Sequence, residues 1–166
     1  MRCSSLISVT IVSDTKYIGH NFLHRCTSLT SVSIPKTVEK VGDSFMFDCK
    51  SVPSVTLPES LKEVGHRFMW GCDNLVWLEY SGHFKAPSVP FGTGKLGRII
   101  MNMGTPGTYM GVTLQGIQHF TSTVKTVFRA SADLPTEIIV NIISKIIGLS
   151  WNETADILVH AKLIKF

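Results

Sequence analysis

Four cysteines are the most reactive side chains of this sequence, and their spacing is regular. Cys3, Cys26, Cys49 and Cys72 each lie 23 residues from the next. Thiolates can bind zinc, but the chain has no C-x-x-C pair of the kind that structural zinc sites use. An even number of cysteines also permits disulfides. Because all four recur at one position beside apolar neighbours, we predict free thiols packed inside the protein.

Two other patterns could also carry chemistry. His20, Asp43 and His66 each lie 17 residues after a cysteine. A metal could bridge them, although a solvated ladder of His and Asp side chains is the favoured interpretation. Gly92-x-Gly94-x-x-Gly97 matches the dinucleotide-binding fingerprint, but a Pro-rich loop precedes it and an expected strand follows, whereas the motif requires a strand and then a helix. We therefore predict no catalytic residue, no cofactor and no metal.

The elements that position these residues repeat with the cysteines. Apolar residues come three, six and eight positions after each one: Leu6, Leu29, Val52 and Leu75; Val9, Val32, Val55 and Leu78; Ile11, Ile34, Leu57 and Tyr80. A glycine recurs at 19, 42 and 65, which suits a positive φ or a close backbone approach. A fixed period of this length predicts a solenoid of stacked coils, each with a short strand. Opposite charges also share columns, which predicts ion pairs between neighbouring coils: Lys16, Glu39 and Lys62; Lys36 and Glu59; Lys50 and Asp73.

The stretch "IPKTVEKVGDSFMFDCKSVPSVTLPESLKEVGHRFMWGC" resembles the BspA-like leucine-rich repeats. The resemblance covers about residues 1–80. One difference is that Phe22, Phe45 and Phe68 stand where the family usually has a small residue, and the next position, usually Phe, holds Leu or Met. The resemblance implies a protein-binding or surface-binding scaffold and not a catalyst.

The predicted fold is α/β, a short leucine-rich-repeat solenoid closed by a C-terminal helical hairpin. Residues 1–130 form the solenoid, with about four regular coils over 3–80 and one or two degenerate coils over 81–130. "LGRIIM" (96–101) fits a coil, "VTLQGIQHF" (112–120) and "STVKTVFRA" (122–130) look strand-like, and Val124-x-x-Val127 marks a further coil.

Residues 131–166 form the hairpin. Its first helix starts near Pro135 with Asp133 as a cap and stops at Gly148, and its second follows the capping box Ser150–Glu153.

Composition limits the partners. The net charge of +4 is small and the Lys and Arg residues are dispersed, so we expect no nucleic acid. No apolar run is long enough to span a membrane. The compartment is unknown, but an intracellular location is favoured, because no signal peptide is visible and the cysteines look like free thiols. No polar cap precedes Cys3, so we expect a fragment, a truncated product or an edge that another protein covers.

We predict a non-enzymatic protein–protein interaction scaffold, for example as a subunit of a larger assembly. The expected surface combines the outward strand positions with an aromatic column that also includes His24. The predicted partner-binding residues are Phe47, Trp70, Trp77, Glu79, Ser31, Ser33, Ser54 and Thr56. The alternative for the aromatic column is that Phe47 and Trp70 pack under the loop at 81–95.

Three alternatives to this function stay open. "LPTEIIVNIIS" (134–144) resembles the start of an F-box, which implies an adaptor that uses the C-terminal helices. "ISKIIGLSWNETADIL" (143–158) resembles a helix-turn-helix, although its second helix lacks Arg and Lys. A nucleotide-binding protein that uses residues 81–110 is the third.

Overall fold

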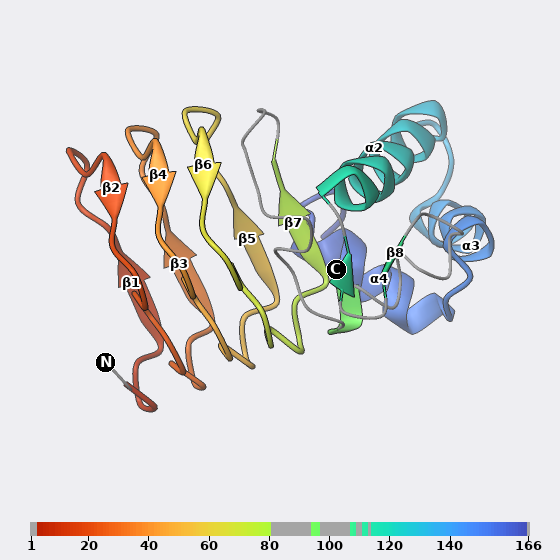
Figure 1. The fold of residues 1–166 in the computed structure, drawn as a ribbon. Helices are drawn as coiled ribbons and strands as arrows, with labels where there is room; N and C mark the ends of the chain where they lie inside the picture. The colour runs from red at the N-terminus through yellow and green to blue at the C-terminus, as the bar shows by residue number, and fades with distance from the viewer. Residues whose placement is uncertain (1–2, 81–93, 97–106, 109–110, 113, 166) are drawn as a thin grey trace.

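A computed structural model gives the structure of the chain, and it describes residues 3–80, 94–96, 107–108, 111–112 and 114–165. The first 80 residues form stacked coils with two rows of short strands (Figure 1). One row contains β1 (Ser8–Thr10), β3 (Ser31–Ser33), β5 (Ser54–Thr56) and β7 (Trp77–Glu79). The other row contains β2 (Tyr17–Ile18), β4 (Lys40–Val41) and β6 (Glu63–Val64).

The register of the strands follows the repeat. In parallel pairs, Val9 lies beside Val32, Val41 beside Val64, and Val55 beside Leu78. Each partner is 23 residues further along the chain. The predicted repeat and its short strands are therefore confirmed.

Identical columns fill the interior of the stack. Cys26, Cys49 and Cys72 are buried and free, as predicted, whereas Cys3 in the first coil is free but only half-buried, because no coil among the described residues covers it from the other side. Phe45 is fully buried and stacks on Phe68 with ring centroids 5.4 Å apart. Because the Met46 and Met69 side chains are also buried, both columns that differ from the family pattern contribute to the core.

The repeated glycine allows a close approach between coils. A Cβ on Gly65 would lie 2.5 Å from the Asp43 backbone nitrogen, whereas a Cβ on Gly19 in the first coil would meet nothing within 4 Å. The repeated glycines at 19, 42 and 65 do not have a positive φ. Positive φ angles occur at other positions of the repeat, mostly at non-glycine residues, for example at Leu23 (58°) and Met46 (53°). Each such residue costs roughly 1–2 kcal/mol relative to a right-handed conformation, so coil packing has to hold these turns.

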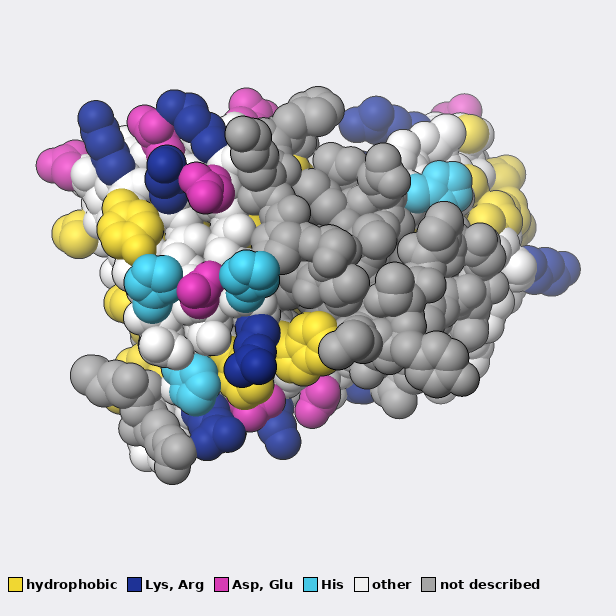
Figure 2. Space-filling model, in the orientation of Figure 1, with side chains coloured by type: hydrophobic (Ala, Val, Ile, Leu, Met, Phe, Trp, Pro, Cys, Tyr) yellow, Lys and Arg dark blue, Asp and Glu magenta, His cyan; other side chains and the backbone are white. Residues whose placement is uncertain are grey.

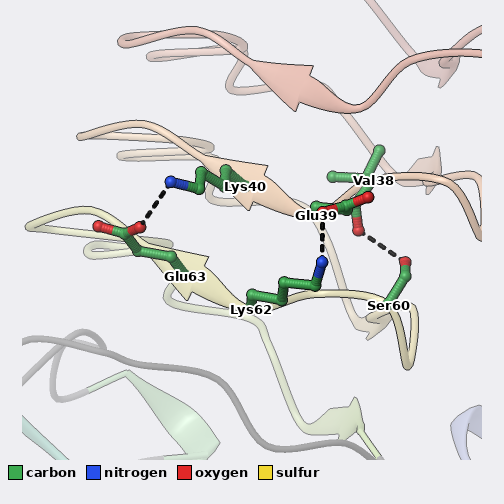
Figure 3. A network of polar contacts seen from close by, with 6 residues as sticks. All are labelled: Val38, Glu39, Lys40, Ser60, Lys62 and Glu63. Atoms are coloured by element: carbon green, nitrogen blue, oxygen red, sulfur yellow. Dashed lines mark hydrogen bonds and ion pairs between the residues drawn. The ribbon is translucent and has the colours of Figure 1, made fainter.

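Ion pairs connect neighbouring coils on the outside (Figure 3). Lys62 Nζ lies 2.5 Å from Glu39 Oε2, which confirms a predicted pair and holds the pKa of Glu39 below its usual value. Lys40 Nζ lies 3.3 Å from Glu63 Oε2, a pair that the sequence reasoning missed. The Ser60 hydroxyl also donates to the Val38 carbonyl at 2.7 Å.

The first row of strands is interrupted between β3 and β5, which belong to different sheets. The Thr30 N–H donates to the Ile7 carbonyl at 2.8 Å, and the Val76 N–H donates to the Pro53 carbonyl at 2.9 Å. Pro53 occupies the same position of the third coil and has no N–H to donate to Thr30. The proline therefore removes one bond of the ladder at the middle of the stack.

The C-terminal part contains a small hairpin, β8 (Gly107–Thr108) with β9 (Gly111–Val112), and three helices. These are α2 (Leu114–Ala130), α3 (Thr136–Ile147) and α4 (Trp151–His160). They gather at the β7 end of the stack (Figure 1). No helix among the described residues is long and apolar enough to cross a membrane.

Helix α2 corrects the prediction of strands and a further coil at 112–130. Ile117, Phe120 and Val124 are buried, and their spacing of three and four residues places them on one face of a helix. Val124 and Val127 are therefore one helical turn apart and do not mark a coil. Of "LGRIIM", only Leu96 is described, and its N–H donates to the Leu75 carbonyl at 2.9 Å.

Helices α3 and α4 confirm the predicted pair, with one correction. Gly148 ends α3 with φ 69°, and Ser150 and Glu153 form the capping box of α4. The cap at Asp133 is wrong, because the N-cap of α3 is Pro135 and no side chain caps it.

Candidate partner-binding groove

The structure divides the predicted partner-binding residues into two groups. Ser31, Ser33, Ser54, Thr56, Trp77 and Glu79 lie on the first row of strands. Phe47 and Trp70 lie in the turns before Cys49 and Cys72 and line neither of the hollows described below. The single surface expected from the sequence is therefore two surfaces.

A groove of about 570 Å³ lies over the strand group. Its floor comes from β3, β5 and β7, and its wall comes from the ends of α2 and α4. The described lining residues are Thr30, Ser31, Val32, Ser54, Thr56, Trp77, Glu79, Lys125, Arg129, His160, Ala161, Lys162 and Leu163. A second hollow of about 790 Å³ shares Val32, Thr56, Glu79 and Lys162 with it and also includes Ser33, Lys36 and Glu59. We call the two together the strand-face groove.

Trp77 is part of the floor of the groove and not the outward-facing anchor that the sequence predicted. Its side chain is only 2% exposed, and its ring meets the Phe120 ring edge-on at a centroid distance of 5.8 Å. The indole N–H donates to Glu79 Oε2 at 3.1 Å. Its large size is therefore explained by packing between β7 and α2.

The Glu79 carboxylate has two partners within the protein. In addition to the bond from Trp77, it forms an ion pair with Lys125 of α2. This pair joins the last regular coil to the helices across 46 residues of sequence. The carboxylate charge is thus already compensated within the protein.

Two further cations line the groove without such compensation. Arg129 and Lys162 are exposed, and neither makes an ion pair with any residue that the structure describes. Lys162 also has a φ of 57°, a left-handed conformation that a residue with a Cβ disfavours. Sequence reasoning missed this basic side of the groove.

The aromatic column lies elsewhere on the stack. Phe47 is half-buried and stacks on His24 with ring centroids 5.0 Å apart and planes 8° from parallel. Trp70 is half-buried as well. The loop at 81–93 lies outside the described residues, so its predicted packing over this column stays a prediction.

The His and Asp column forms the expected surface ladder. The Asp43 N–H donates to His20 Nδ1 at 3.0 Å, and the His66 N–H donates to Asp43 Oδ1 at 2.7 Å. Figure 2 shows His and acidic side chains in a row across the coils. The described part of the chain contains no group of three His, Cys, Asp or Glu residues that could hold a metal ion.

The thiols of Cys49 and Cys72 are poor nucleophiles. Burial raises the pKa of Cys49 to about 12 and shifts the pKa of Cys72 in the same direction. The Cys49 thiol donates to the Leu23 carbonyl at 3.0 Å, and the Cys72 thiol donates to the Met46 carbonyl at 3.2 Å. Both groups therefore stay protonated inside the stack. Of the glycine pattern that matches the dinucleotide fingerprint in letters, Gly92 and Gly97 lie outside the described residues.

A family of known repeat proteins matches the regular part of the chain. Residues 1–87 match the BspA type leucine rich repeat region family, with six copies. A solved structure, the leucine rich repeat protein of T. pallidum, is similar at 26% identity and a TM-score of 0.44. The match covers 49% of this chain and 39% of that one, so the chain spans well under half of that protein. No curated protein matches.

Proposed function

Since the chain belongs to the BspA type leucine-rich repeat family, we propose that it is a non-enzymatic scaffold that binds a protein partner in the strand-face groove. The observation that carries this proposal is the groove itself. Six of the eight residues expected to bind a partner line it, and the helices supply its second side.

The helices have two roles in this proposal. They close the stack after four regular coils, because α2 covers Trp77 and pairs with Glu79. They also convert an open strand face into a groove with a wall. In this organisation, residues 3–80 form the regular solenoid and residues 114–165 the helical unit.

Ser54→Tyr tests the proposal, because it places a ring on the floor of the groove. Ser8→Tyr is the matched control, since Ser8 occupies the same column of the first coil and does not line the groove. Proteins captured by the wild type and the two variants are compared by quantitative mass spectrometry. We expect a partner that Ser8→Tyr retains and Ser54→Tyr loses; retention of every partner by Ser54→Tyr contradicts the proposal.

A second candidate function is an adaptor that uses the C-terminal helices, and one observation favours it. Leu134, which lies just before α3, and Ile138 and Ile146 of α3 are 42–46% exposed. Ile138 and Ile146 are eight residues apart, about two helical turns, which puts both on the outer side of α3. This outer stripe suits a partner helix. Ile138→Glu would remove such a partner and leave groove-dependent partners bound.

A further inference from the structure

The strand-face groove has a distinct chemical character. Hydroxyl groups of Ser31, Ser54 and Thr56 line its floor. Lys125, Arg129 and Lys162 come from the helical side. Such a surface offers hydrogen bonds along its floor and positive charge along one wall.

The charges of the groove do not cancel. Among the described lining residues of the 570 Å³ hollow, three cations face one carboxylate, Glu79, which is already paired with Lys125. The 790 Å³ hollow adds one cation, Lys36, and one carboxylate, Glu59, whose charges offset each other. The C-terminal ends of α2 and α4 each add roughly half a negative charge. Arg129 and Lys162 together exceed this contribution, so a positive excess of about one charge is left for a ligand.

We propose that the strand-face groove binds an extended, acidic peptide segment of a partner protein, an inference that rests on the proposed function. Carboxylates of the segment pair with Arg129 and Lys162, and its backbone bonds to the hydroxyl groups of the floor. The two connected hollows cross β3, β5 and β7, which suits an extended segment more than a single carboxylate.

A nucleic acid is also anionic, but the groove suits it less. Binding of single strands relies on aromatic rings that stack on bases, and the aromatic ring in the groove, Trp77, is 2% exposed. The observations therefore favour a peptide.

To test this proposal, the full-length chain is used as bait to select from random peptides displayed on phage. The affinity of the enriched peptides is then measured. Arg129→Glu/Lys162→Glu reverses the charge of the groove. Lys145→Glu on α3 is the charge control, because Lys145 is exposed and does not line the groove. Ser54→Tyr blocks the groove without a charge change, and single-stranded RNA serves as a competitor.

We expect the enriched peptides to be acidic and their affinity to fall about tenfold or more in the double reversal. Lys145→Glu should lower the affinity less. Added salt should weaken binding of these peptides to the wild type. Neutral or basic peptides that Ser54→Tyr excludes would overturn the acidic segment and leave the proposed function standing. Peptides that neither Ser54→Tyr nor the reversal affects, or no enriched peptide, would contradict both. RNA that displaces the peptides and binds more tightly would show that the groove prefers nucleic acid.

Discussion

Replacing Trp77 by Ala tests whether the helices are joined to the solenoid. The indole is 2% exposed, packs on Phe120 and donates to Glu79. Burial of about 150–250 Å² at about 25 cal/mol per Å² gives roughly 4–6 kcal/mol as an upper limit. Truncation of a buried aromatic usually costs about 3–5 kcal/mol, so we expect that range for the free energy of unfolding.

Urea denaturation followed by circular dichroism measures this loss, and two variants show its origin. Trp77→Phe keeps one aromatic ring but removes the N–H donor and part of the buried volume, so it should cost about 1–3 kcal/mol and less than Trp77→Ala. Trp70→Ala truncates a half-buried ring and should cost less than Trp77→Ala. A Trp77→Ala protein that loses less than about 1 kcal/mol would refute the packing of α2 on β7.

Three further predictions concern the stack. The pKa of Cys49 rises from about 8.5 in the unfolded chain to about 12, so the unfolded chain loses this proton first and stability falls as pH rises above about 8.5. We expect Cys49 to lower the free energy of unfolding by about 1.4 kcal/mol per pH unit above that value. Urea denaturation between neutral and alkaline pH measures this slope, and Cys49→Ala should remove the contribution of this thiol. An equal pH slope in both proteins would contradict the burial of Cys49. Gly65→Ala should cost about 1–3 kcal/mol through its clash with Asp43, and Gly19→Ala, with open space at the same position, should cost much less; equal effects on melting would argue against the close contact. Hydrogen exchange should be faster at the Ile34 amide than at Leu57, whose N–H donates to the Glu79 carbonyl at 2.8 Å, because β3 and β5 are not paired; equal protection would mean an unbroken sheet.

The repeat could be predicted from the sequence because each column recurs. Cys26, Cys49 and Cys72 share a position, and stacking gives that position the same surroundings each time. Burial, strand pairing and the Lys62–Glu39 pair all follow from this regularity.

The helical side of the groove could not be predicted in the same way. The β-branched residues of 122–130 suggested strands, and only the spacing of Ile117, Phe120 and Val124 indicated a helix. Lys125 and Arg129 are far from Glu79 in sequence, so no local pattern brings these charges together. Trp77 looked like an exposed residue because its column holds serine in the other coils, and the contact with Phe120 reverses that expectation.

The positive φ angles at Leu23 and Met46 were also beyond sequence reasoning. The repeated glycine was the expected candidate for such a conformation, but close packing against the preceding coil explains Gly42 and Gly65 instead.

Amide hydrogen exchange of the chain with and without a captured partner tests the groove most directly. We expect new protection on β3, β5 and β7 and at the ends of α2 and α4, around Arg129 and Lys162. Phe47, Trp70 and the outer stripe of α3 should exchange as in the free chain. Protection confined to the aromatic column or to α3, with the strand-face groove unchanged, would contradict the account.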